Sequence, residues 1–312
     1  MMNIRNISMA AFLVGGSLFS HLFTALAQEN DVALAHVKYE LVHVDDTNFR
    51  DNPRKEEMML YFGKRSSMYN SFALATMLEK MKKDMEEKQR VDAGKAGARN
   101  GMNQSRIFVS SPNVSNETLY LFPQENSAYL SSSMGTGTYI IPQAYPLIDW
   151  QIGDGVKEIG GYACQQATGT FGGREYTAWF TTELPFPYGP WKLHGLPGLI
   201  LEAEDSRKEV VFRYAGFDKQ EGGSIEIVLP KDAITTTAKD FAKAKAAFDK
   251  DPMANALRGI DVPAGANVAR KIVMKDQNGR ELSPDEFNAM REMTMKTGKV
   301  KNPNNPLELE DK

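Results

Sequence analysis

Hydrophobic and polar residues alternate along several short stretches of the chain, which is typical of strands buried on one face. In the clearest stretch, residues 33–44, Val37, Tyr39 and Leu41 fall on one face and charged or histidine side chains fall on the other. Shorter strand-like stretches are 58–62, 119–122, 129–130, 138–141, 199–203, 209–214, 224–229 and 268–274. We expect the three stretches between residues 199 and 229 to form an antiparallel meander.

The strongest local signal is a β-hairpin over residues 162–182. Its arms, residues 162–168 and 174–181, are joined through Gly172 and Gly173. Paired glycines supply the positive φ angles that a tight hairpin turn requires. The sequence therefore predicts two antiparallel strands here.

Helical periodicity is confined to three segments. Ser71 can cap a helix, a second helix is predicted over residues 239–248, and a third begins at Ser283, where Glu286 completes a capping box. The apolar face of the first helix consists of Leu74, Leu78, Met81 and Met85. We predict an α+β protein, predominantly antiparallel β, with a curved sheet or open half-barrel and a few amphipathic helices on one face.

One apolar segment, residues 191–200, shows neither the alternation of a strand nor the periodicity of a helix. Its two glycines and one proline argue against a helix, and it is too apolar for a solvent loop. The expected structure is a buried corner that turns the chain into a strand, because glycine permits unusual φ angles or close backbone approach and proline fixes φ. The alternative is a groove lined by backbone. The corner comprises Gly195, Leu196, Pro197, Gly198, Leu199 and Ile200.

Prolines and aromatic residues precede this corner. Exposed aromatic rings on such a rigid segment would form a docking surface for a ligand or a partner. The candidate residues for that surface are Phe186, Tyr188, Trp191 and His194.

These motifs together resemble the GLPGLI family of secreted bacterial proteins. The resemblance rests on the hairpin with Gly173-Arg174, on residues 189–192, on the Gly195-to-Ile200 signature and on the C-terminal residues 305–308. It implies an exported protein of a Gram-negative bacterium and supplies no catalytic residues.

The N-terminus has the pattern of a secretory signal peptide over residues 1–27. Arg5 precedes an uncharged apolar stretch that ends in Ala25-Leu26-Ala27. An uncleaved membrane anchor is the alternative, although the stretch is shorter than the roughly 20 residues of a spanning helix. After cleavage no transmembrane segment is expected, so the sequence predicts a periplasmic or extracellular protein.

The remaining residues, 28–312, are expected to form one β-rich domain with a mobile loop at 89–106 and a variable insertion at 238–267. The chain carries a net charge of −3, which argues against a nucleic-acid partner. Its single cysteine, Cys164, excludes an intramolecular disulfide.

Few residues offer chemistry. His36 and His43 are seven positions apart on one predicted strand and point to opposite faces, so they do not share a metal. A hydrolase would need His194 to meet a carboxylate or Cys164. No zinc, serine-hydrolase or cofactor motif is present, so no cofactor is predicted.

Three classes of function remain. The sequence favours a non-catalytic exported protein that binds a small apolar ligand or an envelope protein. A hydrolase that uses His194 is the first alternative, and a structural envelope component is the second.

Overall fold

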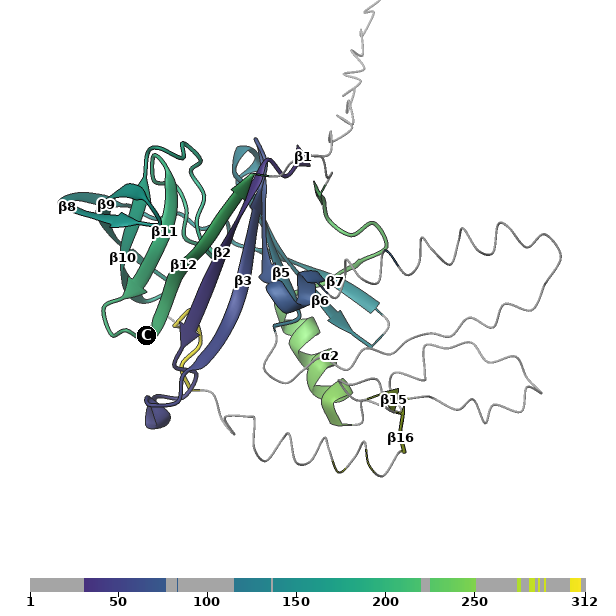
Figure 1. Cartoon of the computed structure of the whole chain (residues 1–312). Helices are drawn as coiled ribbons and strands as arrows, with labels where there is room; N and C mark the ends of the chain where they lie inside the picture. Colours follow the sequence, from purple (N-terminus) through teal and green to yellow (C-terminus); the bar gives the residue numbers. More distant parts are fainter. Residues whose placement is uncertain are drawn as a thin grey trace, which may run out of the picture.

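A large open sheet of mostly antiparallel strands dominates the computed structural model (Figure 1). The structure describes residues 31–76, 83, 115–135, 137–219, 225–250, 274–275, 281–283, 286, 289 and 304–309. Twelve strands form the sheet in the order β14-β7-β6-β5-β4-β3-β2-β12-β11-β10-β9-β8. The predicted fold class is confirmed, because the sheet is curved and not closed and helices are few.

The strands of this sheet are β2 (Ala35–His43), β3 (Arg54–Phe62), β4 (Ser67–Ser71), β5 (Glu117–Phe122), β6 (Ser127–Met134), β7 (Gly137–Gln143), β8 (Gln151–Ile159), β9 (Tyr162–Phe171), β10 (Arg174–Thr181), β11 (Leu199–Asp205), β12 (Val210–Lys219) and β14 (Ile234–Thr235). Two short pairs lie outside it: β1 (Asp31–Val32) with β13 (Glu226–Ile227), and β15 (Met274–Lys275) with β16 (Glu281–Leu282). Only β14 runs parallel to its neighbour in the large sheet, β7.

The helical elements are short. Two 3-10 turns, η1 (Thr47–Phe49) and η2 (Pro123–Glu125), join strands, and α2 (Ala238–Lys250) confirms the helix predicted over residues 239–248. Phe241 of α2 contacts the ring of Tyr139 on β7, which places the helix beside that edge of the sheet. Within the described residues, no helix is long and apolar enough to cross a membrane.

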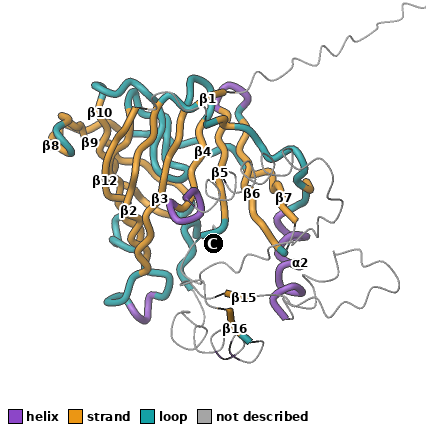
Figure 2. The backbone as a smooth tube through the Cα atoms, turned by 45° about the vertical axis from the view of Figure 1, so that its right-hand side comes forward, coloured by secondary structure: helices purple, strands orange, loops and turns teal. Residues whose placement is uncertain are grey.

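Alternation explains which face of the sheet is buried. On β2 the odd-numbered residues are buried and the even-numbered ones are partly exposed, so His43 and His36 point to opposite faces as predicted. The hairpin is also confirmed, since β9 and β10 pair through Gly172 and Gly173, whose φ angles are 55° and 69°. Figure 2 shows the strands of the sheet side by side, with β8 and β9 at one end and β6, β7 and helix α2 at the other.

The predicted meander is wrong in its third strand. β11 and β12 pair as expected, but β12 continues onto β2, and β13 pairs with β1 instead. The segment around Ile227 packs with Tyr120 and Phe122 in a second, smaller hydrophobic cluster. The apolar pattern at 224–229 therefore marks a cover for the sheet and not its next strand.

Several predicted segments lie wholly or partly outside the described residues. Residues 72–76 and residue 83 are helical, and the other residues of the first predicted helix lie outside the described part of the chain, as do the loop at 89–106 and residues 251–267. At the third helix the capping box is present: Ser283 N donates to Glu286 Oε2 over 2.8 Å, and Glu286 N donates to Ser283 Oγ over 3.1 Å.

Candidate functional site

The segment that precedes β11 packs into the core of the curved sheet. Leu193 and Leu196 are fully buried, and Phe62 of β3 contacts the rings of Phe186 and Tyr188. The hydroxyl of the buried Tyr39 donates to the carbonyl of Ile200 over 2.6 Å, which ties the corner to β2.

The two signature glycines meet different requirements. Gly195 has a φ of 94°, a conformation that other residues rarely adopt, and the space beside it is open. Gly198 has no such angle, but a Cβ atom there would lie 2.1 Å from the carbonyl oxygen of Thr181. The corner therefore needs backbone freedom at one glycine and close backbone approach at the other.

Trp191 and His194, two candidate surface residues, lie in the protein interior. Trp191 packs edge-on against Phe171 at 5.6 Å between ring centroids. His194 Nε2 lies 2.9 Å from the carbonyl oxygen of Pro146, and its ring tilts against Tyr145. Burial lowers the pKa of His194, and the bond to the Pro146 carbonyl opposes that shift only in part.

The hydrolase alternative requires His194 to contact Cys164, and the described residues show no such contact. The thiol is buried, and this burial raises its pKa to about 11. Cys164 Sγ lies 3.5 Å from the carbonyl oxygen of Tyr162, and no contact among the described residues joins it to His194. A thiol with a raised pKa is poorly suited to nucleophilic attack.

The other two candidate residues, Phe186 and Tyr188, line a cavity of about 420 Å³, although Tyr188 is itself buried, at 3% exposure. The cavity lies between the segment that precedes the signature, the β3–β4 turn and η2. We call it the mouth cavity. Its walls are formed by Leu34, Gly63, Lys64, Arg65, Pro123, Gln124, Pro185, Phe186, Pro187 and Tyr188.

Apolar and cationic groups meet at the mouth cavity. Leu34 is 40% exposed there, whereas Lys64 and Arg65 are both exposed on the turn beside it. Asp31 holds this turn, because its carboxylate accepts hydrogen bonds from the backbone N–H groups of Lys64 at 3.3 Å and Arg65 at 2.8 Å. No local sequence pattern marks this wall of the cavity, because the pairing of β3 with β4 places the turn there.

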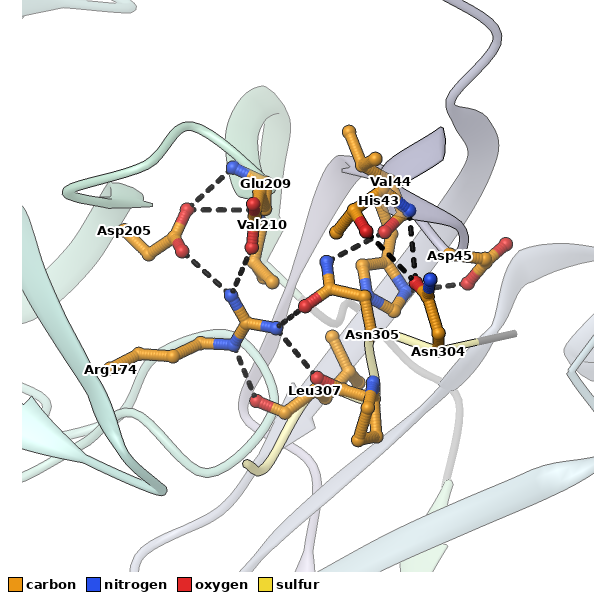
Figure 3. Close-up of polar contacts among 12 residues, drawn as sticks. His43, Val44, Asp45, Arg174, Asp205, Glu209, Val210, Asn304, Asn305 and Leu307 are labelled. Atoms are coloured by element: carbon orange, nitrogen blue, oxygen red, sulfur yellow. Dashed lines mark hydrogen bonds and ion pairs between the residues drawn. The ribbon is translucent and has the colours of Figure 1, made fainter. Parts of the chain in front are cut away.

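The motifs at residues 174 and 305–308 meet in a buried polar cluster (Figure 3). The Arg174 guanidinium donates to Asp205 at 2.7 Å and to Glu209 at 3.2 Å. It also donates to Asn305 Oδ1 at 2.6 Å and to the carbonyl oxygens of Pro306 and Leu307 at 2.7 and 3.0 Å. Every N–H group of the guanidinium has a partner. Since three of these partners belong to residues 305–307, the cluster holds the C-terminal segment in place, and we call it the clamp.

Further contacts fasten the same segment. Asn305 Nδ2 donates to the carbonyl of Val44 over 2.7 Å, and the ammonium of Lys192 pairs with Glu308. Residues 304–309 thus bridge the end of β2 and the β9–β10 turn, where Leu309 N donates to the carbonyl of Gly172. These motif residues have a structural role.

A histidine–aspartate pair also lies near this clamp. His43 Nδ1 is 2.7 Å from Asp45 Oδ1, and Arg54 Nε donates to the same carboxylate at 3.0 Å. Burial raises the pKa of Asp45, but His43 and Arg54 outweigh it and leave that pKa lowered. The cluster has the dyad of a general base, but His43 is buried at 3% exposure, so no substrate reaches it in this structure.

The fold and the site define a β-rich protein with an open curved sheet, a buried corner and a mouth cavity. Residues 172–202, which span the end of the hairpin and the signature, match a family described as a protein of unknown function (Porph_ging). That match fits an uncharacterised family and does not itself name the GLPGLI family. No curated protein matches the chain.

Solved structures of low similarity exist. Two crystal forms of PNGF-II, in space groups P21 and C2, are 11% and 10% identical to this chain, each with a TM-score of 0.44. In both cases the match covers 67% of this chain and 32% of the other. The chain thus matches about a third of the length of those structures.

Proposed function

We propose that this protein is an exported binding protein that takes a small apolar ligand with one anionic group in the mouth cavity. The observation that carries the proposal is the meeting of the Phe186 and Tyr188 rings with Lys64 and Arg65 in one cavity. Aromatic walls bury the apolar body of a ligand, and the cations attract its charged end.

The size and stiffness of the cavity support a small ligand. Its volume of about 420 Å³ falls within the range of small-molecule sites. Pro123, Pro185 and Pro187 line it, and proline restricts the backbone. Such a wall loses little conformational entropy when a ligand binds.

Binding is tested with two fluorescent probes that differ by one charge. These are 1-anilinonaphthalene-8-sulfonate and the uncharged N-phenyl-1-naphthylamine. We expect the sulfonate to bind saturably and more tightly than the uncharged probe. Lys64→Glu should weaken only the sulfonate, by about tenfold. Leu34→Asp should weaken both probes, because it places a charge in the apolar wall.

The matched control is Lys55→Glu, a charge reversal at an exposed position of β3 that does not line the cavity. It should leave both affinities unchanged. Saturable binding that is equal in all four proteins, or no saturable binding of either probe, would overturn the proposed site.

Export is the second part of the proposal. The apolar N-terminal stretch and its Ala25-Leu26-Ala27 pattern support a cleaved signal peptide over residues 1–27. N-terminal sequencing of the protein from a Gram-negative host should read Gln28 first, in the periplasm or the medium. An intact N-terminus in the membrane fraction would favour the anchor.

A further inference from the structure

The large sheet ends in an open edge at β8. Among the residues that the structure describes, β8 is the last strand in the sheet order and pairs with β9 alone (Figure 1). Two large apolar residues are exposed on this strand, Ile152 at 51% and Val156 at 79%, and Leu147, four residues before the strand begins, is 80% exposed. An exposed edge with apolar side chains is a template for pairing with another chain.

The second half of β8 is the regular part of this edge. A bulge between Ile152 and Val156 disturbs the first half, whereas Val156 to Ile159 pair in register with β9. Gly160 and Gly161 form the two-residue turn, with φ angles of 59° and 87°. Such a turn closes on a hydrogen-bonded pair and the pairs then alternate, so the backbone N–H and C=O groups of Val156 and Glu158 face away from β9.

The charge of this edge is acidic. Asp154 and Glu158 are exposed on either side of Val156, and neither forms an ion pair with another described residue. The strand's one lysine, Lys157, is already engaged: its ammonium lies 2.6 Å from Glu202 Oε2 and 4.4 Å from the ring centre of Trp179. An occupant of the edge therefore meets two unneutralised carboxylates.

These charges disfavour a second copy of the chain as the occupant. Antiparallel self-pairing centred on Val156 would place Asp154 opposite Glu158. Self-pairing centred on Lys157 or on Glu158 would place that residue opposite its own copy. Like charges directly opposite each other destabilise a strand pair.

We propose that the β8 edge binds an extended segment of another protein by strand addition, and that this segment carries an apolar residue flanked by lysine or arginine. Backbone hydrogen bonds to Val156 and Glu158 supply affinity, as in other strand-addition complexes. The flanking cations neutralise Asp154 and Glu158, and the apolar residue covers Val156. This site lies on a different element from the mouth cavity and does not depend on it.

The test uses the full chain and a fluorescent peptide, Lys-Val-Lys-Val-Lys, with Glu-Val-Glu-Val-Glu as the acidic control peptide. Fluorescence anisotropy should show saturable binding of the basic peptide only. Glu158→Lys should weaken that binding about tenfold. Glu158→Pro should abolish it, because proline removes a donor that faces away from β9 and spares the β8–β9 ladder.

The matched control is Asp232→Lys, a charge reversal at an exposed position before β14. It should bind the basic peptide like the unaltered chain, and thermal unfolding should show that all three variants remain folded. If Glu158→Pro does not fold, Glu158→Lys alone decides. The proposal would be overturned if both peptides bind equally, if the basic peptide does not bind, or if Glu158→Lys binds it as tightly as the unaltered chain does. It would also be overturned if sedimentation shows a dimer of the unaltered chain that Glu158→Lys makes more stable, because the edge would then pair with a second copy.

Discussion

Arg174 and Asn305 are 131 positions apart in the chain, and the Arg174 guanidinium donates to Asn305 Oδ1 over 2.6 Å. Asp205 and Glu209 hold the other side of the same guanidinium, and all four side chains are buried. Arg174 thus pairs with two buried carboxylates, one of which, Glu209, also pairs with Arg50, and it fixes the C-terminal segment.

Replacement of Arg174 by alanine should therefore destabilise the fold severely. It leaves Asp205 and Glu209 buried with less compensation, and breaking a buried pair in this way costs about 3–5 kcal/mol. Urea unfolding measures the change. Arg213→Ala is the control, because Arg213 and Glu40 form a largely exposed pair at 3.3 Å, worth at most about 1 kcal/mol. Similar losses in both variants would contradict the clamp.

The two signature glycines should respond differently to alanine. Gly195→Ala forces a side chain into a φ of 94° without a clash, at a cost of about 1–3 kcal/mol. Gly198→Ala brings Cβ to 2.1 Å from the Thr181 carbonyl oxygen, so a strand must shift. We expect Gly198→Ala to lower the thermal midpoint more than Gly195→Ala does. If Gly195→Ala lowers the midpoint more, close approach of the Thr181 backbone does not explain why residue 198 is a glycine.

The sequence predicted those elements that are determined by residues close together in the chain, such as turn glycines and helix caps. The hairpin at 162–182 follows from Gly172 and Gly173, and the capping box at Ser283 follows from its spacing. Strand β8 was missed because Gly153 and Gly155 interrupt its alternation, and its pairing with β9 defines it. The short strand β4 was missed because buried polar residues obscure the pattern.

The sequence singles out only part of the wall of the mouth cavity. Phe186 and Tyr188, which line it, stand out as aromatic residues between prolines, whereas Lys64, which also lines it, carries no local signal. It comes to the cavity because strand order places the β3–β4 turn beside residues 185–188. Trp191 and His194 belong to the same stretch of sequence, but both are buried at 9% exposure, Trp191 in the main hydrophobic core and His194 against Tyr145 and Pro146.

Stability in acid should depend on Glu209. Burial alone would raise the pKa of Glu209, but hydrogen bonds and charges from Arg174 and Arg50 outweigh it and hold that pKa below the ordinary 4.5. As the pH falls, Glu209 is protonated in the unfolded chain before it is protonated in the folded chain. Its contribution to the free energy of unfolding is therefore complete above pH 4.5 and is lost as the pH falls through the lower pKa of the folded state. Urea unfolding between about pH 6 and 3 should show a shallower decline for Glu209→Gln than for the unaltered chain.

His194 should contribute pH dependence in a separate, higher window. Burial lowers its pKa below the ordinary 6.5, although the Pro146 carbonyl favours the protonated ring. The unfolded chain therefore takes up a proton first as the pH falls below 6.5, and the folded state loses stability from there downward. His194→Gln keeps a donor for the Pro146 carbonyl and should remove this part of the decline.

In an NMR titration, the ring resonance that disappears in His194→Gln should titrate below 6.5 in the unaltered chain. A midpoint at 6.5 would mean that the ring is solvated, and a midpoint above it that the ring is paired with an acid; either would show that the buried-corner interpretation of His194 is wrong.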